Sequence, residues 1–142
     1  MENKKNNYCT CLYYSANALA RKITKMAEEA FATTGLAPSY ALLMMSISKN
    51  PGLHPMELSE IMMLTPSTVT RLIEKLELKG LVKRKNEGKF TYVQPTSEGK
   101  KLTFKIEKAW HRLYMEYTEI LGEKNAKELT SQIFEAVEKL ES

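Results

Sequence analysis

Aspartate is absent from this 142-residue sequence, so that all 17 acidic side chains are glutamates. A Ser/His/Asp triad is therefore excluded, and the sequence has neither a glycine-rich phosphate loop nor a paired-histidine motif. His54 and His111 are the only histidines. Because these absences remove the common signatures of catalysis, we do not expect an enzyme.

Cysteine is also scarce, since Cys9 and Cys11 are the only two. They do not make a disulfide framework, and no CxxC or Cys/His cluster points to zinc. We therefore expect no metal site and no cofactor. The sequence also lacks a run of about 18 apolar residues and the long apolar segment of a signal peptide. A cytoplasmic protein without a membrane partner is expected.

What the chain does have is an uneven distribution of charge. The net charge is +4, but residues 65–105 hold ten Lys or Arg against four Glu, a net +6. The rest of the chain holds 11 basic against 13 acidic residues, a net −2. Positive charge gathered in one segment is the footprint expected of contact with phosphate, although a solvated basic hairpin would have the same charge.

Apolar residues recur at helical spacing over most of the chain, with prolines at helix starts and glycines at helix ends. This pattern predicts six helices and one hairpin. In chain order they are a long helix 9–31 ended by 33–35, helices 38–49 and 55–62, a helix 65–79 ended by Gly80, strands 81–85 and 89–94 around the turn 86–88, a long helix from 100 to Gly122, and a last helix through Leu140.

This order predicts a mainly α fold with a small β-hairpin wing, in which the third and fourth helices form a winged helix-turn-helix. We assign residues 1–142 to a single domain, with 36–99 as the winged helix-turn-helix DNA-binding lobe. Residues 8–34 and 100–142 are expected to form a helical dimerisation region, because terminal helices with long apolar stripes need partners. A homodimer would place two such lobes on half-sites about one helical turn apart.

The fourth helix carries a pattern that a structural helix does not need. Val69, Leu72, Ile73 and Leu76 follow helical spacing and are expected to point inward. The outward face near the helix start has short hydroxyls in place of the Glu, Lys and Gln that favour helix on a solvent face. Small side chains let a helix approach bases closely, and Arg71 can reach a guanine edge with two hydrogen bonds.

We therefore predict that this helix and the basic hairpin bind DNA, with the hairpin on the backbone or in the neighbouring minor groove. The predicted DNA-binding residues are Thr65, Ser67, Thr68, Thr70, Arg71, Lys75, Arg84, Lys85 and Lys89. The alternative is a winged-helix protein–protein interaction module without DNA specificity. Salt separates the two, because DNA binding should weaken steeply as the salt concentration rises.

The chain also carries the motif Ser67-x-x-Thr70-Arg71-Leu72-x-x-Lys75-Leu76-x-x-Lys79-Gly80-Leu81-Val82-x-Arg84, followed by Thr96-x-x-Gly99. This motif resembles the MarR family of bacterial transcription regulators, and the resemblance extends over nearly the whole chain. It implies a symmetric dimer, a repressor, and a pseudo-palindromic double-stranded operator. It also implies a recognition helix in the major groove and a wing in the minor groove, with Lys75 toward the DNA backbone.

The wing departs from that resemblance at its tip. The family normally has Asp-x-Arg there, with the arginine in the minor groove, whereas this sequence has Glu87-Gly88-Lys89. Lys89 keeps the positive charge but lacks the planar fork of arginine. The sequence preference of the wing therefore stays open.

Cys9 is the first candidate for a switch that releases DNA. The segment Cys9-x-x-Leu12-Tyr13 resembles the organic-hydroperoxide-sensing branch of the family, in which the matching cysteine is oxidised to sulfenic acid. A thiol at a helix start, with Lys4 and Lys5 upstream, has the surroundings of a reactive cysteine.

Other positions both support and oppose a redox role for Cys9. Tyr40 matches one of the tyrosines that hold the cysteine in that branch, but Ala37 stands where the other is expected. No C-terminal resolving cysteine follows, and Cys11 points away from Cys9 within a helix. The alternative is that both cysteines are small buried hydrophobes.

A small phenolic or apolar effector is the second candidate for a switch. The resemblance implies that it would bind between the dimer helices and the DNA-binding lobe. The candidate pocket residues are Tyr13, Tyr40, Met45, Met62 and Trp110, with Met63 and Tyr114 nearby. Core packing would explain the same methionines and aromatics.

Overall fold

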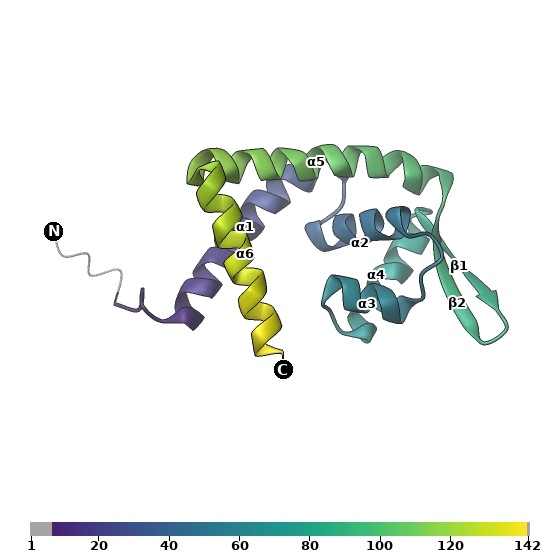
Figure 1. Ribbon diagram of the computed structural model, residues 1–142. Helices are drawn as coiled ribbons and strands as arrows, with labels where there is room; N and C mark the ends of the chain where they lie inside the picture. The colour runs from purple at the N-terminus through teal and green to yellow at the C-terminus, as the bar shows by residue number, and fades with distance from the viewer. Residues whose placement is uncertain (1–6, 142) are drawn as a thin grey trace.

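Six α-helices, one 3₁₀ turn and a two-stranded hairpin follow one another in residues 7–141, the part of the chain that the computed structural model describes (Figure 1). They are α1 (Leu12–Phe31), η2 (Ala32–Thr34), α2 (Pro38–Lys49), α3 (Pro55–Met62), α4 (Pro66–Leu78), β1 (Val82–Glu87), β2 (Phe90–Pro95), α5 (Ser97–Leu121) and α6 (Glu123–Leu140).

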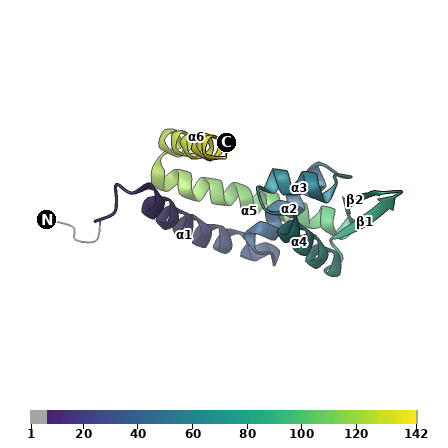
Figure 2. The same ribbon diagram turned by 90° about the horizontal axis from the view of Figure 1, so that it is seen from below.

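The long helix α5 connects the two ends of the molecule. At one end it packs against α2 and the wing strand β2, and at the other it meets α1 and α6 (Figure 1). Figure 2 shows α1 and α6 on opposite sides of α5. None of the described helices is by itself long and apolar enough to span a bilayer, and only the pair 12–34 and 38–49, bent by 62°, meets those criteria of length and composition.

The helix-turn-helix is formed by α3 and α4, each of which begins with a proline that directly follows an N-cap residue. His54 caps α3 through a reciprocal box, in which its Nδ1 accepts from the Met56 N–H and the Glu57 carboxylate accepts from the His54 N–H. Between the helices, Met63 takes a left-handed conformation with φ 54°. This sharp reversal ends α3 and lets Thr65 start α4 as its N-cap.

The hairpin is antiparallel and is fastened to the helix-turn-helix. Its register pairs Val82 with Pro95 at the base and Glu87 with Phe90 at the tip. At its base, Val93 exchanges backbone hydrogen bonds with the loop before α3, accepting from the Gly52 N–H at 2.9 Å and donating to the Leu53 carbonyl at 3.0 Å. The wing is therefore tied to the segment that leads into α3.

The junction between α4, the wing and α5 depends on one threonine and one glycine. The Thr96 hydroxyl donates to the Gly80 carbonyl at 2.6 Å and accepts from the Gly99 N–H at 3.1 Å, so it joins the end of α4 to the start of α5. A Cβ on Gly99 would collide with the backbone of Leu81. Only glycine therefore lets α5 pack this closely against the chain that enters the wing.

The hydrophobic core lies where α2, α3, α4 and α5 meet. Its largest fully buried side chains include Leu43 of α2, Leu58 of α3, Ile73 of α4 and Ile106 of α5. The helices α1 and α6 bury far less. Ala126 is the only buried residue of α6 within 123–140. Large apolar side chains are exposed instead on α1, the end of α5 and α6, namely Leu12, Tyr13, Ile120, Leu121, Ile133, Phe134 and Leu140.

The expected fold class and element order are confirmed, with three boundaries corrected. The first helix starts at Leu12 and not at Cys9, because residues 7–10 form turns. The hairpin loop is Gly88-Lys89, since the strands pair through Glu87 and Phe90. The fifth helix starts at Ser97, so Gly99 lies inside its first turn.

Candidate nucleic-acid interface

The helix α4 has the two faces that its sequence predicts. Val69, Ile73 and Leu76 are buried and Leu72 is half-buried, so the inward stripe holds α4 in the core. On the opposite face Ser67, Thr70 and Arg71 are exposed. The apolar stripe thus packs in the core, and the hydroxyl-rich face is accessible to a ligand.

The start of α4 presents a connected group of hydroxyls. The Thr65 Oγ1 accepts from the Thr68 N–H at 3.3 Å, and it lies 2.8 Å from the Thr68 hydroxyl and 3.3 Å from that of Ser67. Thr68 is half-buried, whereas Ser67, Thr70 and Arg71 are exposed. The Arg71 guanidinium lies 3.5 Å from the Thr68 hydroxyl, so it extends back toward the helix start.

Lys75 lies on the same helix but is directed toward α2. Its ammonium is 5.9 Å from the centre of the Tyr40 ring, within the range of a cation–π contact. Lys75 is exposed and Tyr40 half-buried. This contact places Lys75 at the edge of the α4 surface, beside the α2 helix.

The wing divides the basic residues between two faces, because side chains alternate along a strand. Val82 is buried and shares its face with Arg84, which pairs with the buried Val93. Lys83 and Lys85 lie on the other face, which we call the outer face of the wing. Across β2 this face also carries Phe90, Tyr92 and Gln94. The predicted set Arg84, Lys85 and Lys89 therefore does not form one surface.

Arg84 is held by Glu77 of α4. Its Nη2 donates to Glu77 Oε1 at 2.9 Å, and its Nε and backbone N–H both lie 3.4 Å from Oε2. This hydrogen bonding lowers the pKa of Glu77 and raises that of Arg84. The pair joins the first strand of the wing to the end of α4.

Sequence reasoning missed the aromatic half of the outer face. Phe90 is 61% exposed, and its ring centre lies 6.4 Å from that of Tyr92. It also omitted Lys83, which alternation would have placed beside Lys85. The missed signal was the two-residue period of the strands, which places Phe90 and Tyr92 on the same face as Lys85.

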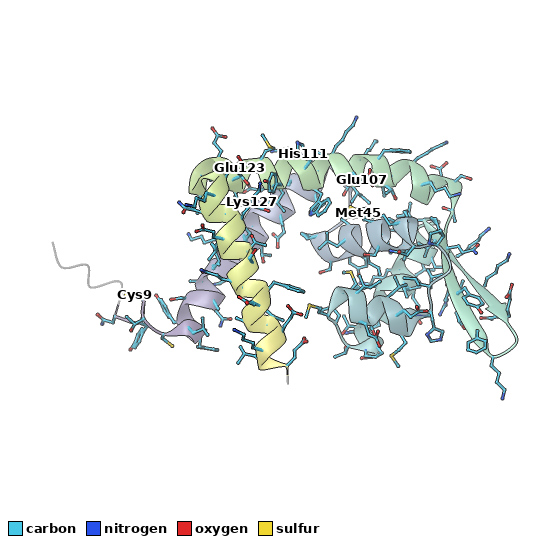
Figure 3. All side chains as sticks on the ribbon, viewed as in Figure 1. Cys9, Met45, Glu107, His111, Glu123 and Lys127 are labelled. Atoms are coloured by element: carbon cyan, nitrogen blue, oxygen red, sulfur yellow. The ribbon has the colours of Figure 1, made fainter. Side chains whose placement is uncertain are left out.

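Cys9 lies in the turns before α1, at the free end of that helix (Figure 3). Both cysteines are free and exposed, so the alternative that they are buried hydrophobes is wrong. Within one chain, Cys9 precedes the start of the 20-residue helix α1 and Tyr40 follows its end, so about 30 Å of helix separates them. Lys4 and Lys5, expected upstream, lie outside the described residues.

The five candidate effector residues are distributed over four elements. Tyr13 is on α1 and is 80% exposed. Tyr40 and Met45 are both on α2, and Met45 is buried in the hydrophobic core. Met62 ends α3, and its sulfur lies 3.9 Å from the Ser46 hydroxyl. Trp110 on α5 packs beneath the ammonium of Lys49 at 5.0 Å. Core packing accounts for Met45.

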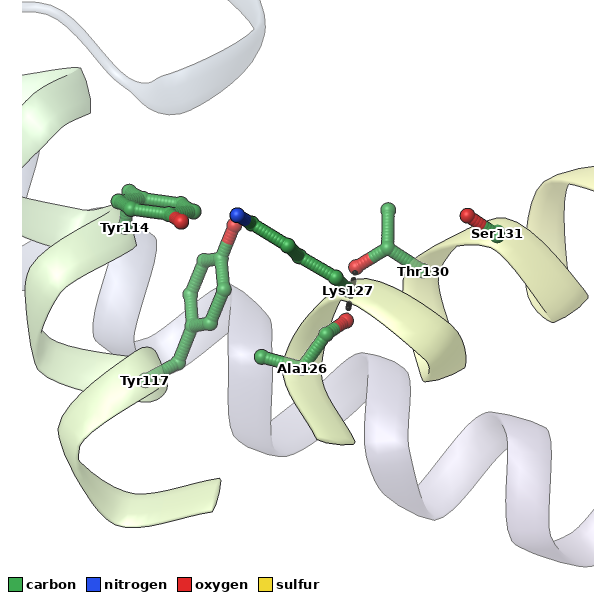
Figure 4. Close-up of a pocket in the computed structure, with 6 residues that line it drawn as sticks. All are labelled: Tyr114, Tyr117, Ala126, Lys127, Thr130 and Ser131. Atoms are coloured by element: carbon green, nitrogen blue, oxygen red, sulfur yellow. Dashed lines mark hydrogen bonds between the residues drawn. The ribbon is translucent and has the colours of Figure 1, made fainter. Parts of the chain in front are cut away.

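A cavity of about 340 Å³ lies elsewhere, at the elbow between α5 and α6 (Figure 4). Tyr114 and Tyr117 line it from α5, and Lys127 reaches toward the two rings from α6. Burial raises the pKa of Tyr117, and the Glu123 carboxylate raises that of Lys127. In residues 7–141 no cluster of three His, Cys, Asp or Glu side chains could hold a metal ion.

A helix-turn-helix with an exposed hydroxyl-rich second helix and a basic hairpin defines the class of winged helix-turn-helix proteins. The model of the MarR family matches residues 34–89, which run from the end of η2 through the wing tip. The winged helix-turn-helix of this chain is therefore similar to that of the MarR family. A comparison with curated proteins found no match.

Solved structures share the fold over nearly the whole chain. The transcriptional repressor CouR bound to a 23-mer DNA duplex is 19% identical with a TM-score of 0.87, covering 96% of this chain and 99% of that one. CouR bound to p-coumaroyl-CoA is 20% identical with a TM-score of 0.85, covering 96% and 98%. A putative MarR family regulator from Listeria monocytogenes complexed with 26-mer DNA is 20% identical with a TM-score of 0.76, covering 99% and 90%.

Proposed function

We propose that the protein is a sequence-specific, double-stranded DNA-binding transcriptional regulator that acts as a dimeric repressor. The observation that carries the proposal is the exposed start of α4, where Ser67, Thr70 and Arg71 face outward, opposite the apolar stripe that holds the helix in the core. Solved neighbours of the same fold bound to DNA duplexes support it. The proposed site of action is the bacterial cytoplasm.

In this proposal α4 enters the major groove. Thr65 and Ser67 approach the phosphates together with the free N–H groups at the helix start, and Arg71 reads a guanine edge. Lys85 and Lys89 of the wing add contacts to the DNA backbone. Arg84 takes a different role from the one that its sequence predicts, because its guanidinium is engaged with Glu77. It positions the wing on α4.

The test is a binding titration with the DNA upstream of the protein's own gene, over a range of salt concentrations. Arg71→Ala should lose the preference for this DNA over an unrelated duplex, by about 10-fold or more for a lost bidentate contact. Arg112→Ala is the matched control, since it removes an arginine that pairs with Glu116 on α5. Equal behaviour of the two variants would refute the assignment of α4.

The alternative of a protein–protein module makes the opposite prediction for salt. A DNA-binding protein should show a steep loss of affinity as salt rises, because neutralised phosphates release counterions. Wild-type protein that binds neither specific nor unrelated duplex at low salt would favour the alternative.

We further propose that DNA is released by oxidation of Cys9 or by a small phenolic or apolar effector. Exposure of the Cys9 thiol supports the first route. The p-coumaroyl-CoA ligand of CouR supports the second, as a ligand of a protein with this fold. The same titration with peroxide-treated wild-type and Cys9→Ser protein separates them. Release by peroxide that needs Cys9 supports oxidation, and release by added p-coumaroyl-CoA in both proteins supports an effector.

A further inference from the structure

Phe90 occupies an unusual place for a large apolar side chain. It is the first residue after the two-residue loop of the wing, on the outer face, and 61% of it is exposed. The buried side of the hairpin is the opposite one, which carries Val82 and Val93. The ring of Phe90 therefore contributes little to the core that holds the wing.

Packing within the wing accounts for only part of this ring. Tyr92 lies two residues further along the same strand, with its ring centre 6.4 Å away and tilted by 30°. Such a contact limits the orientations of the Phe90 ring. Because more than half of the residue remains accessible, the contact supports the ring without burying it.

The charges around Phe90 fit a nucleic acid. Lys83 and Lys85 lie on the same outer face, Lys89 precedes Phe90 in the loop, and all three are exposed. Glu87, the cross-strand neighbour of Phe90, is the one acidic group of the wing, which leaves a surplus of positive charge on this face. Lysines that flank an aromatic ring suit phosphates on either side of an apolar base step.

The shape of the tip fits the narrower groove of a duplex. A two-residue loop is the tightest connection of a hairpin, and Gly88 at its first position has φ 61° and no side chain. Paired strands are about 4.8 Å apart, and the minor groove of B-DNA is about 6 Å wide. The thickness of the two strands adds to that spacing, so the tip enters fully only where the groove is opened by a kink in the duplex, with Phe90 directly behind the loop.

We propose that Phe90 is an apolar wedge that contacts a base step in the minor groove beside the α4 site and bends the duplex there. This inference rests on the proposed DNA-binding function and adds a determinant of specificity to it. Lys89 at the tip lacks the planar fork with which an arginine recognises bases. The selectivity of the wing therefore comes from how easily the DNA sequence can be deformed. Flexible pyrimidine–purine steps would be preferred at this position, since wedges of this kind partly unstack a base step.

The test uses a duplex enriched from a random library by the wild-type protein, labelled at both ends for energy transfer. Phe90→Ala should bind it about 10-fold more weakly, as expected for burial of part of a phenyl ring, and should lose the bend. Phe90→Leu should retain most of the bend, because leucine also serves as a wedge. Phe104→Ala is the matched control, since Phe104 is a phenylalanine of similar exposure, 69%, that lies on α5 and not on the wing.

The outcomes separate this inference from the function on which it rests. Phe90→Ala that binds and bends the duplex like the wild type overturns the wedge, even when Arg71→Ala confirms sequence-specific binding. A straight duplex in the wild-type complex overturns it as well. Wild-type protein that enriches no sequence from the library overturns the proposed function itself. The slope of affinity against salt should be the same for wild type and Phe90→Ala, because no charge is removed.

Discussion

At the level of single residues, the orientation of the wing depends on one carboxylate. Glu77 accepts hydrogen bonds from both the side chain and the backbone of Arg84, so it fixes the first wing strand to α4 in position and in direction. A change at Glu77 should therefore affect DNA binding through the position of the wing, although Glu77 itself lies away from the proposed DNA surface.

Glu77→Gln should reduce the free energy of unfolding by at most about 1 kcal/mol, since both partners are more than a third exposed and exposed ion pairs contribute little. Its pH dependence has a definite sign. Because the Arg84 hydrogen bond lowers the pKa of Glu77 in the folded protein, the pair stabilises the fold above the ordinary glutamate pKa of about 4.3. That stabilisation is lost as the pH falls through the lowered pKa.

Melting temperatures measured between about pH 7 and pH 3 should show this difference. Wild-type protein should lose an increment of stability in acid that Glu77→Gln has already lost at neutral pH. Glu98→Gln is the control, because its pair with Lys101 is more exposed, at 71% and 76%. Parallel curves for wild type and Glu77→Gln would contradict the role given to this pair.

At the level of elements, the junction of α4, the wing and α5 is held by a single hydroxyl. The Thr96 Oγ1 both donates to Gly80 and caps α5 through Gly99. Thr96→Ala should cost about 2 kcal/mol in urea unfolding, the sum of an N-cap and one further hydrogen bond. Thr96→Ser keeps the hydroxyl and should recover most of that loss. Equal losses in the two variants would show that the methyl group, and not the hydroxyl, matters.

This junction also shows where prediction from sequence succeeds and where it fails. Helix limits marked by local signals, such as Pro66 after Thr65, are correct because capping is decided by neighbours in the chain. Gly99 was taken to lie before the helix, since glycine is a poor helix former. Its position inside α5 is required by the nearby backbone of Leu81, a tertiary contact that no local pattern records.

The interface was predictable to a similar extent. The inward and outward faces of α4 follow from helical spacing and are as expected. The role of Arg84 was not predictable from charge, because its partner Glu77 lies seven residues away on another element. The effector residues could not be grouped from sequence at all, since their type is shared with ordinary core positions.

At the level of the whole molecule, the exposed apolar side chains of α6 indicate a surface that is covered in a dimer. Ile133, Phe134 and Leu140 are all exposed in the single chain, which would be costly for a monomer in water. The assignment of residues 8–34 and 100–142 to dimerisation stays a prediction.

Phe134→Glu should convert a dimer into monomers, because it places a charge in an apolar interface. Sedimentation at micromolar concentration would measure this change, and binding to a two-half-site duplex should fall with it. Gln132→Glu is the control, since it adds the same charge at an exposed α6 position two residues away. Unchanged mass for Phe134→Glu would show that α6 does not form the interface.

The length of α5 gives the molecule a mechanical property. Its 25 residues form a rod of about 37 Å, anchored at one end to the wing root and at the other to the elbow with α6. A tilt of about 5° at the elbow would carry the wing root through about 3 Å, close to the separation of about 3.4 Å between successive base pairs. The rod is thus a lever, and a small rotation near Tyr117 is enough to shift α4 and the wing relative to the DNA surface that they are proposed to bind.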